Sequence, residues 1–253
     1  MNEDKSRLPG ELSYDLFRKR AQNIAYSNYE KIGFADELRI DKEVQIFQDV
    51  IRKLSNLTRM NQRVLDIGAG CTSLPHNIAA HCEKQETDLY LIDSMEMLSN
   101  LEINSTRVTK IPGMFPNHFA DFINENKGTF DVILAYSVLQ YVAIDTSLVR
   151  FIDSVAELLK EGGQCLLGDI PNIDKRNRFF SSAAGVNFHR SRNGVDTFPD
   201  VQWNRIHSAE LDDSLIFFVL QRFRNFGFES YLLPQDNDLP MSNRREDILI
   251  IKH

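Results

Sequence analysis

Short apolar runs alternate with amphipathic segments along most of the chain. Apolar runs of four to eight residues between turn residues are typical of buried strands, and apolar residues spaced three or four apart are typical of helices. We predict strands near 63–67, 88–93, 106–111, 130–136 and 164–170. Helices are expected between them, near 73–82, 95–103, 116–126 and 145–160. This alternation predicts an α/β fold of parallel βαβ units with right-handed connections, whose strand ends meet at one edge of the sheet.

Further elements are predicted on both sides of this region. Apolar spacing indicates two helical segments before residue 59, so we expect an N-terminal helical cap over 1–58 and a core over 59–253. Residues 171–206 show little periodicity and contain several Pro, Gly, Lys and Arg residues, which predicts an irregular insertion that serves as a lid or binds the substrate. A buried helix is expected at 215–226, and strands are expected at 228–233 and 247–251.

A glycine turn follows the first predicted strand. The run Val64–Ile67 breaks into Gly68-Ala69-Gly70, and helical spacing resumes after it. Because glycine has no Cβ and adopts positive φ, a ligand can lie against bare backbone there. The second strand ends at Asp93, about where an acidic residue binds ribose hydroxyls in nucleotide-binding α/β proteins. The G-x-G-x-x-G/A motif of dinucleotide-binding folds ends in a small residue, and Ser73 stands at that position here. The sequence therefore favours a site for another nucleoside-containing ligand over a site for NAD.

Asp66 extends the turn to D-x-G-x-G, and here the chain resembles the class I S-adenosylmethionine-dependent methyltransferases. Three further segments, Leu91–Leu98, Phe130–Tyr141 and Leu158–Leu167, are similar to later motifs of that family. The resemblance covers roughly residues 60–170. It implies S-adenosyl-L-methionine as cofactor and a Rossmann-like, seven-stranded, mostly parallel sheet of order 3-2-1-4-5-7-6 with an antiparallel C-terminal hairpin.

The resemblance also implies which residues bind the cofactor. The methionine portion would lie against Asp66, Gly68, Ala69 and Gly70, the ribose against Asp93, and the adenine beside Ser94 and Met95. Tyr136 and Ser137 follow the fourth strand, where family members contact both cofactor and acceptor. Many members have an acidic residue for the adenine amine after the third strand. This chain has Ile111–Phe115 instead, so we expect the backbone of Gly113 and Met114 to take that role.

Methyl transfer from a sulfonium depends mainly on holding the acceptor in line with the methyl group and excluding water. A hydroxyl acceptor also benefits from a base. The candidate bases are Asp169, His189 and His207, and Tyr136 is a further predicted catalytic residue. The aromatic residues Tyr14, Phe17, Tyr26 and Tyr29, with Arg20, either pack on the core or partly close over the ligands, and the sequence leaves both open.

The composition and net charge indicate which classes of partner the protein is expected to bind. The net charge of -7 and the 42% hydrophobic residues describe a globular chain without the basic surface typical of nucleic-acid binding. Cys71, Cys82 and Cys165 form no metal-ligand spacing, and we predict no metal site. The polar start and the shortness of the apolar stretch Val132–Ile144 predict a cytoplasmic protein without membrane insertion.

The distribution of basic residues predicts the acceptor. Clusters lie at 18–20, 175–178, 189–192 and 244–245, and Arg suits phosphate or carboxylate groups. We therefore expect a small anionic acceptor such as a nucleotide-linked sugar. The segments 168–172 and 239–247 also resemble methyltransferases of bacterial surface-polysaccharide pathways. Two alternatives stay open, an NAD(P)-dependent oxidoreductase and a non-catalytic methyltransferase-like binding subunit, and the sequence does not determine the oligomeric state.

Overall fold

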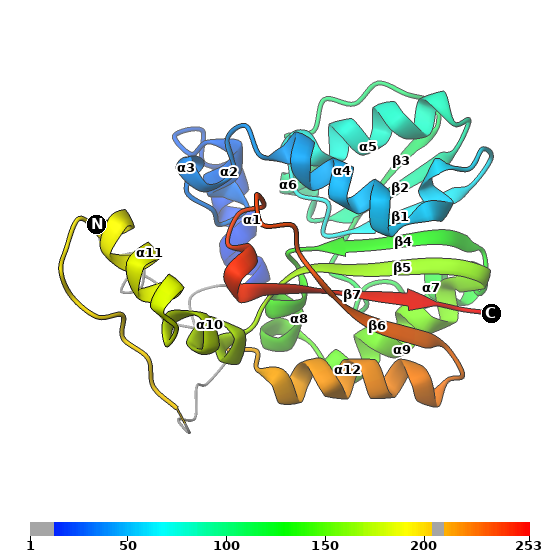
Figure 1. Ribbon diagram of the computed structural model, residues 1–253. Helices are drawn as coiled ribbons and strands as arrows, with labels where there is room; N and C mark the ends of the chain where they lie inside the picture. Colours follow the sequence, from blue (N-terminus) through cyan, green and yellow to red (C-terminus); the bar gives the residue numbers. More distant parts are fainter. Residues whose placement is uncertain (1–12, 204–209) are drawn as a thin grey trace.

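The computed structural model describes residues 13–203 and 210–253, in which helices cover both faces of one central sheet (Figure 1). The sheet has seven strands in the order β3-β2-β1-β4-β5-β7-β6. They are β1 Arg63–Ile67, β2 Asp88–Asp93, β3 Val108–Pro112, β4 Phe130–Tyr136, β5 Leu159–Pro171, β6 Glu229–Pro234 and β7 Arg245–Ile251. Strand β7 pairs antiparallel with both β5 and β6, whereas β1 to β5 are parallel. The predicted fold class is confirmed.

Two hydrophobic clusters, one on each face, hold the layers together. In β4 every residue is buried, and successive side chains point to opposite faces of the sheet. Val132 and Leu134 therefore join the cluster beneath α4 Glu43–Lys53 and α5 Ser73–Lys84. Ile133 and Ala135 join the cluster that includes α9 Leu148–Leu158 and α12 Asp213–Asn225. Burial on both faces explains why this strand reads as a continuous apolar run.

The predicted boundaries differ from the structure in the second half of the core. The helix expected at 145–160 is α9, which Ser147 caps by accepting from the Arg150 backbone N–H. A further helix, α8 Leu139–Asp145, precedes it where no helix was expected. Strand β5 begins at Leu159, five residues earlier than expected, and it includes Gly162 and Gly163. The remaining short core helices are α6 Met95–Leu98 and α7 Ala120–Glu125.

The N-terminal region is helical up to Thr58. It consists of α1 Tyr14–Gln22, α2 Asn28–Lys31, α3 Asp36–Arg39, α4 and the 3₁₀ helix Ser55–Thr58. In Figure 1 α1, α2 and α3 lie together at one end of the sheet, whereas α4 lies beside α5 on a face. The first three helices thus reach the edge where the parallel strands end.

The segment after β5 is more regular than predicted. It forms α10 Ile173–Phe180 and α11 Ala183–Asn193, so the expectation of an irregular insertion is wrong for these residues. The helices begin at capping residues, Asn172 and Ser182, whose side chains accept backbone N–H groups. Capping and a cluster of Phe179, Phe180 and Phe188 hold these helices without a long amphipathic pattern. Residues 204–206 of the predicted insertion lie outside the described residues.

Candidate active site

A cavity opens where the parallel strands end. The ends of β1, β2, β3 and β4 contribute to its wall, and helices α1, α3 and α8 complete it. Eight of the predicted cofactor residues line it, namely Gly68, Ala69, Gly70, Asp93, Gly113, Met114, Tyr136 and Ser137. These residues come from four separate strand ends, and the sheet order alone brings them together.

The glycine turn between β1 and α5 passes close to the segment after β4. Gly68 donates a backbone hydrogen bond to the Ile92 carbonyl at 2.8 Å and has φ +73°. A Cβ added at Gly68 would lie 2.6 Å from Cγ2 of Val138. The turn therefore requires glycine at this position for both conformation and space.

Gly68→Ala is expected to lower the free energy of unfolding by about 2–4 kcal/mol, through positive-φ strain and the contact with Val138. Gly128→Ala is the matched control, since Gly128 has φ +63° and a Cβ there meets nothing within 4 Å. It shares the backbone strain and should lose only about 1 kcal/mol. Urea unfolding of both variants measures the difference, and equal losses would show that the Val138 contact costs nothing.

Asp93 joins the second strand to the glycine turn. Its Oδ2 accepts from the Gly70 backbone N–H at 2.9 Å, and its Oδ1 accepts from the Ser94 N–H at 2.7 Å. Burial raises the pKa of Asp93 to about 6, although both backbone hydrogen bonds favour the charged form. Each oxygen keeps a further lone pair, so the carboxylate can still accept from a ligand.

Asp66, Ser94 and Met95 do not line the cavity. Asp66 is buried inside β1, where desolvation and then the Asp93 charge raise its pKa to about 7. Ser94 is the N-cap of α6 and accepts from the Met97 N–H. Met95 is 60% exposed, since it starts a short helix whose apolar side faces away from it. The carboxylate of Asp66 lies next to the turn rather than within the wall.

The methyltransferase domain family matches residues 39–203, well over half of the chain. The chain belongs to this family. The predictions of a methyltransferase and of S-adenosyl-L-methionine as its cofactor are confirmed.

Solved methyltransferase structures share the fold at low sequence identity. The plantazolicin methyltransferase BpumL, in complex with a monoazolic desmethylPZN analog and SAH, is 14% identical, with a TM-score of 0.59 over 95% of this chain and 96% of that chain. A SAM-dependent methyltransferase from Aquifex aeolicus is 9% identical, with a TM-score of 0.53 over 89% of this chain and 97% of that chain. At these identities the likeness concerns the fold.

One curated relative matches part of the methyltransferase. The similarity to chondramide synthase cmdD of Chondromyces crocatus is 27% identity over 119 residues, which is 47% of this chain. The match spans only 3% of that relative's length. Separately, none of the helices in residues 13–203 and 210–253 is long and apolar enough to cross a membrane.

The predicted catalytic residues of the methyltransferase lie in different surroundings. Tyr136 lines the cavity and is buried, and burial raises its pKa well above the ordinary value. Asp169 is buried between two guanidinium groups and does not line the cavity. His189 lies on α11, where its ring contacts Thr197 and Asn193, and it does not line the cavity either. His207 lies outside the described residues.

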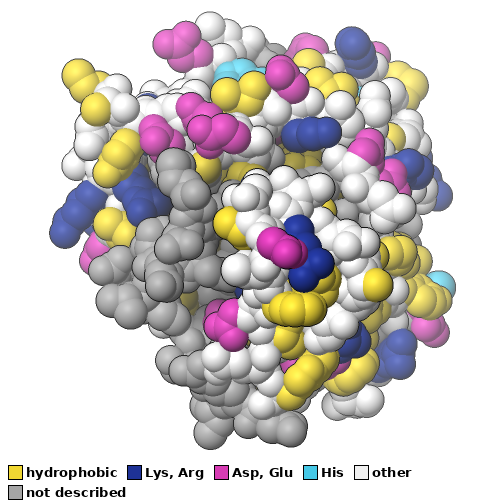
Figure 2. Space-filling model, turned by 60° about the vertical axis from the view of Figure 1, so that its left-hand side comes forward, with side chains coloured by type: hydrophobic (Ala, Val, Ile, Leu, Met, Phe, Trp, Pro, Cys, Tyr) yellow, Lys and Arg dark blue, Asp and Glu magenta, His cyan; other side chains and the backbone are white. Residues whose placement is uncertain are grey.

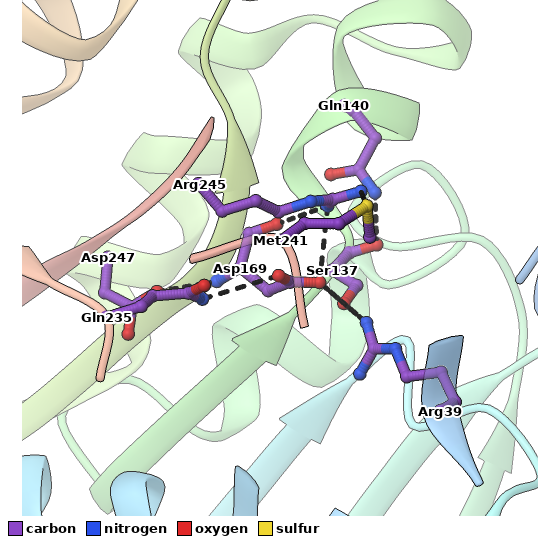
Figure 3. Close-up of polar contacts among 8 residues, drawn as sticks. All are labelled: Arg39, Ser137, Gln140, Asp169, Gln235, Met241, Arg245 and Asp247. Carbon is purple, nitrogen blue, oxygen red and sulfur yellow. Dashed lines mark hydrogen bonds and ion pairs between the residues drawn. The ribbon is translucent and has the colours of Figure 1, made fainter. Parts of the chain in front are cut away.

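Ser137 connects the cavity to the buried ion pairs (Figure 3). It has φ +61°, and its hydroxyl donates to Oδ2 of Asp169. Nη2 of Arg39 donates to both, at 2.8 Å to Ser137 Oγ and 2.7 Å to Asp169 Oδ2. Asp169 also accepts from Nη1 of Arg245 at 3.3 Å. The network holds the residue after β4 in a left-handed conformation that is uncommon for serine.

Several residues of the wall were not identified from the sequence. Arg39, on α3, is 2% exposed, lines the cavity and stacks on Phe34 with 3.9 Å between guanidinium and ring centroid. Its Nε has no hydrogen-bond partner among the described residues. Asp145 and Thr146, at the end of α8, line the cavity as well. No motif marks these positions, because short helices from distant parts of the chain bring them to the site.

The N-terminal aromatic residues divide into two groups. Tyr14 and Phe17 line the cavity, and Phe17 packs edge-on against Tyr141 of α8 with 4.7 Å between ring centroids. Tyr26 and Tyr29 do not line it, and Arg20 lies over the ring of Phe17. Of these aromatic side chains, only Tyr14 and Phe17 of helix α1 thus belong to the cavity wall.

Proposed function

We propose that the methyltransferase transfers the methyl group of S-adenosylmethionine to an oxygen or nitrogen atom of a small polar acceptor. The observation that carries this proposal is the single cavity that joins the glycine turn and Asp93 to Ser137, Tyr136 and Arg39. In the proposed arrangement, the ribose hydroxyls donate to Asp93 and the adenine lies near Gly113 and Met114. The methionine portion lies over Gly68–Gly70, and its ammonium group is attracted by the charge of the Asp66 carboxylate buried next to this turn.

The reaction needs little besides positioning. A lone pair of the acceptor attacks the methyl carbon as the bond from carbon to the sulfonium sulfur breaks, and the bonding pair stays on sulfur. The products are the methylated acceptor and S-adenosylhomocysteine, and the acceptor's proton passes to solvent or to a base. We propose that Tyr136, neutral in its buried position, orients the acceptor. The domain roles follow: residues up to 58 cap the site, and 171–206 contribute to acceptor binding.

We further propose that the acceptor carries a negative charge. The face in Figure 2 shows Lys and Arg side chains scattered among Asp and Glu rather than gathered in one patch. Many of the basic residues that suggested an anionic acceptor pair with acidic residues of the chain, as Arg18 does with Glu96, Arg178 with Asp213, Arg190 with Asp196 and Arg245 with Asp169. The remaining support is Arg39, whose unpartnered Nε suits one anionic group on the acceptor. A role in a surface-polysaccharide pathway stays a prediction from sequence.

The test has two stages. Calorimetric titration with S-adenosylhomocysteine should show binding, with NADH as the control that should not bind. Labelled S-adenosylmethionine is then incubated with sugar nucleotides, phosphorylated metabolites and short azole-containing peptides, the last because of the plantazolicin methyltransferase neighbour. Mass spectrometry should find one acceptor heavier by a CH₂ unit. Absence of S-adenosylhomocysteine binding would contradict the proposed site.

Cofactor affinity is expected to rise with pH. In the ligand-free protein, Asp66 has a raised pKa of about 7, so it is largely protonated at pH 6, whereas the cofactor's ammonium group requires the carboxylate. The dissociation constant for S-adenosylhomocysteine should therefore be about tenfold larger at pH 6 than at pH 8, since only the ionised fraction binds well. Calorimetry at both values measures the change, and Asp66→Asn should remove most of it. An unchanged pH dependence in that variant would exclude Asp66 as the source.

The raised pKa values of Asp66 and Asp93 also make the free energy of unfolding depend on pH. The pKa values of Asp66 and Asp93 are raised by folding from 3.8 to about 7 and about 6. The folded, ligand-free protein therefore binds more protons than the unfolded chain between pH 4 and 7. The contribution of Asp66 and Asp93 to the free energy of unfolding therefore falls as the pH rises from 4 to 7.

A further inference from the structure

The wall of the cavity after β3 provides no acidic side chain for an adenine amine. Gly113, Met114 and Phe115 line this part of the cavity. An exocyclic amine has two N–H donors, and a donor buried without an acceptor costs free energy. An acceptor for the amine must therefore come from another element or from the backbone.

The end of α8 lies beside this turn. Thr146, the residue after α8, donates from its hydroxyl to Oδ1 of Asn117 at 2.8 Å, and Asn117 belongs to the segment that follows β3. Asp145, the last residue of α8, lines the cavity together with Thr146 and Met114. The hydrogen bond from Thr146 to Asn117 thus fixes an acidic residue next to the turn that lacks one.

One oxygen of Asp145 is already used, and the other is available. Oδ2 accepts from the Tyr14 backbone N–H at 2.7 Å, which fastens the start of α1 over the cavity. Within the described residues, Oδ1 accepts no hydrogen bond from protein, and the side chain is half-buried. Tyr14 also lines the cavity, and the charge of Asp93 contributes to its raised pKa, after burial. Tyr14 thus contacts Asp145 through its backbone and lies within electrostatic range of the proposed ribose carboxylate.

We propose that Asp145 accepts a hydrogen bond from the exocyclic amine of the cofactor's adenine ring. Asp145, at the end of α8, thus takes the role of the acidic residue that is missing from the turn after β3. This inference rests on the proposed function, because it needs an adenosyl group in the cavity.

The test compares two ligands, S-adenosylhomocysteine and its analogue with purine in place of adenine, which lacks only the amine. The wild-type protein should bind S-adenosylhomocysteine about tenfold to a hundredfold more tightly than the analogue, the range for a hydrogen bond to a charged acceptor. In Asp145→Ala this preference should fall to within about twofold. The ratio is the measured quantity because loss of the Tyr14 contact weakens both ligands equally.

Two controls complete the experiment. Asp145→Asn keeps an acceptor for the Tyr14 N–H and should also lose most of the preference, which covers the case in which Asp145→Ala folds poorly. Asp15→Ala removes an acidic residue of α1 that is 76% exposed and does not line the cavity, and it should keep the wild-type ratio. A preference retained in both Asp145 variants, or absent from the wild-type protein, would overturn the inference. Failure of the wild-type protein to bind either ligand would instead reject the proposed function itself.

Discussion

Asp169→Asn is expected to lower the free energy of unfolding by about 3–5 kcal/mol. The Asp169 side chain is 3% exposed, and its Oδ2 lies 2.7 Å from Nη2 of Arg39 and 3.3 Å from Nη1 of Arg245. The substitution keeps the size of the side chain and removes the charge, so two buried guanidinium groups lose their counterion. Asn tolerates the positive φ of 57° at this position, so the loss reports charge rather than backbone strain.

The exposed pair of Asp236 and Arg52 provides the control. Its side chains are 48% and 59% exposed, and Asp236→Asn should cost less than about 1 kcal/mol. Urea unfolding of both variants gives the comparison. A loss below 1 kcal/mol for Asp169→Asn would mean that the two arginines find other partners.

Asp93→Ala is expected to weaken binding of S-adenosylhomocysteine by about a hundredfold or more. The substitution removes the carboxylate and with it the proposed hydrogen bonds to the ribose, each of about 1.5–3 kcal/mol. It also removes the acceptor of the 2.9 Å hydrogen bond from the Gly70 backbone N–H, so the glycine turn loses a contact that fixes it. Both losses act on the same ligand, and calorimetry measures their sum.

Asp88→Ala is the matched control for Asp93→Ala. The two residues begin and end the same strand, but Asp88 lies at the opposite edge of the sheet, with its side chain 53% exposed. Its substitution should change the dissociation constant by less than about twofold. Circular dichroism confirms that both variants are folded. A tenfold or smaller effect of Asp93→Ala in a folded protein would contradict the ribose assignment.

Local patterns were sufficient to predict the individual strands and the glycine turn, whereas the order of the strands in the sheet came from the family resemblance. The continuous apolar run of β4 reports burial on both faces, and the break at Gly68 marks a backbone that only glycine adopts without strain. Such signals need nothing beyond neighbouring residues. The C-terminal hairpin was likewise predicted, although the family resemblance rather than periodicity gave its place in the sheet.

The helices of residues 173–193 show where local signals were present and overlooked. Asn172 and Ser182 are typical N-caps, and Gly194 ends α11 in the left-handed conformation. Basic and polar residues obscured the helical periodicity between these caps. Attention to the caps would have predicted both helices.

The sequence by itself determined the order of strands and helices, the glycine turn and the position of Asp93, because each depends on the few residues around it. Only the tertiary structure decided that Arg39 and Asp145 line the cavity and that Asp169 is held by two arginines. Those contacts join residues up to 131 positions apart in the chain, and their formation depends on how α1, α3 and α8 pack at the strand ends. Side chains brought together by packing alone leave no spacing in the sequence by which to recognise them.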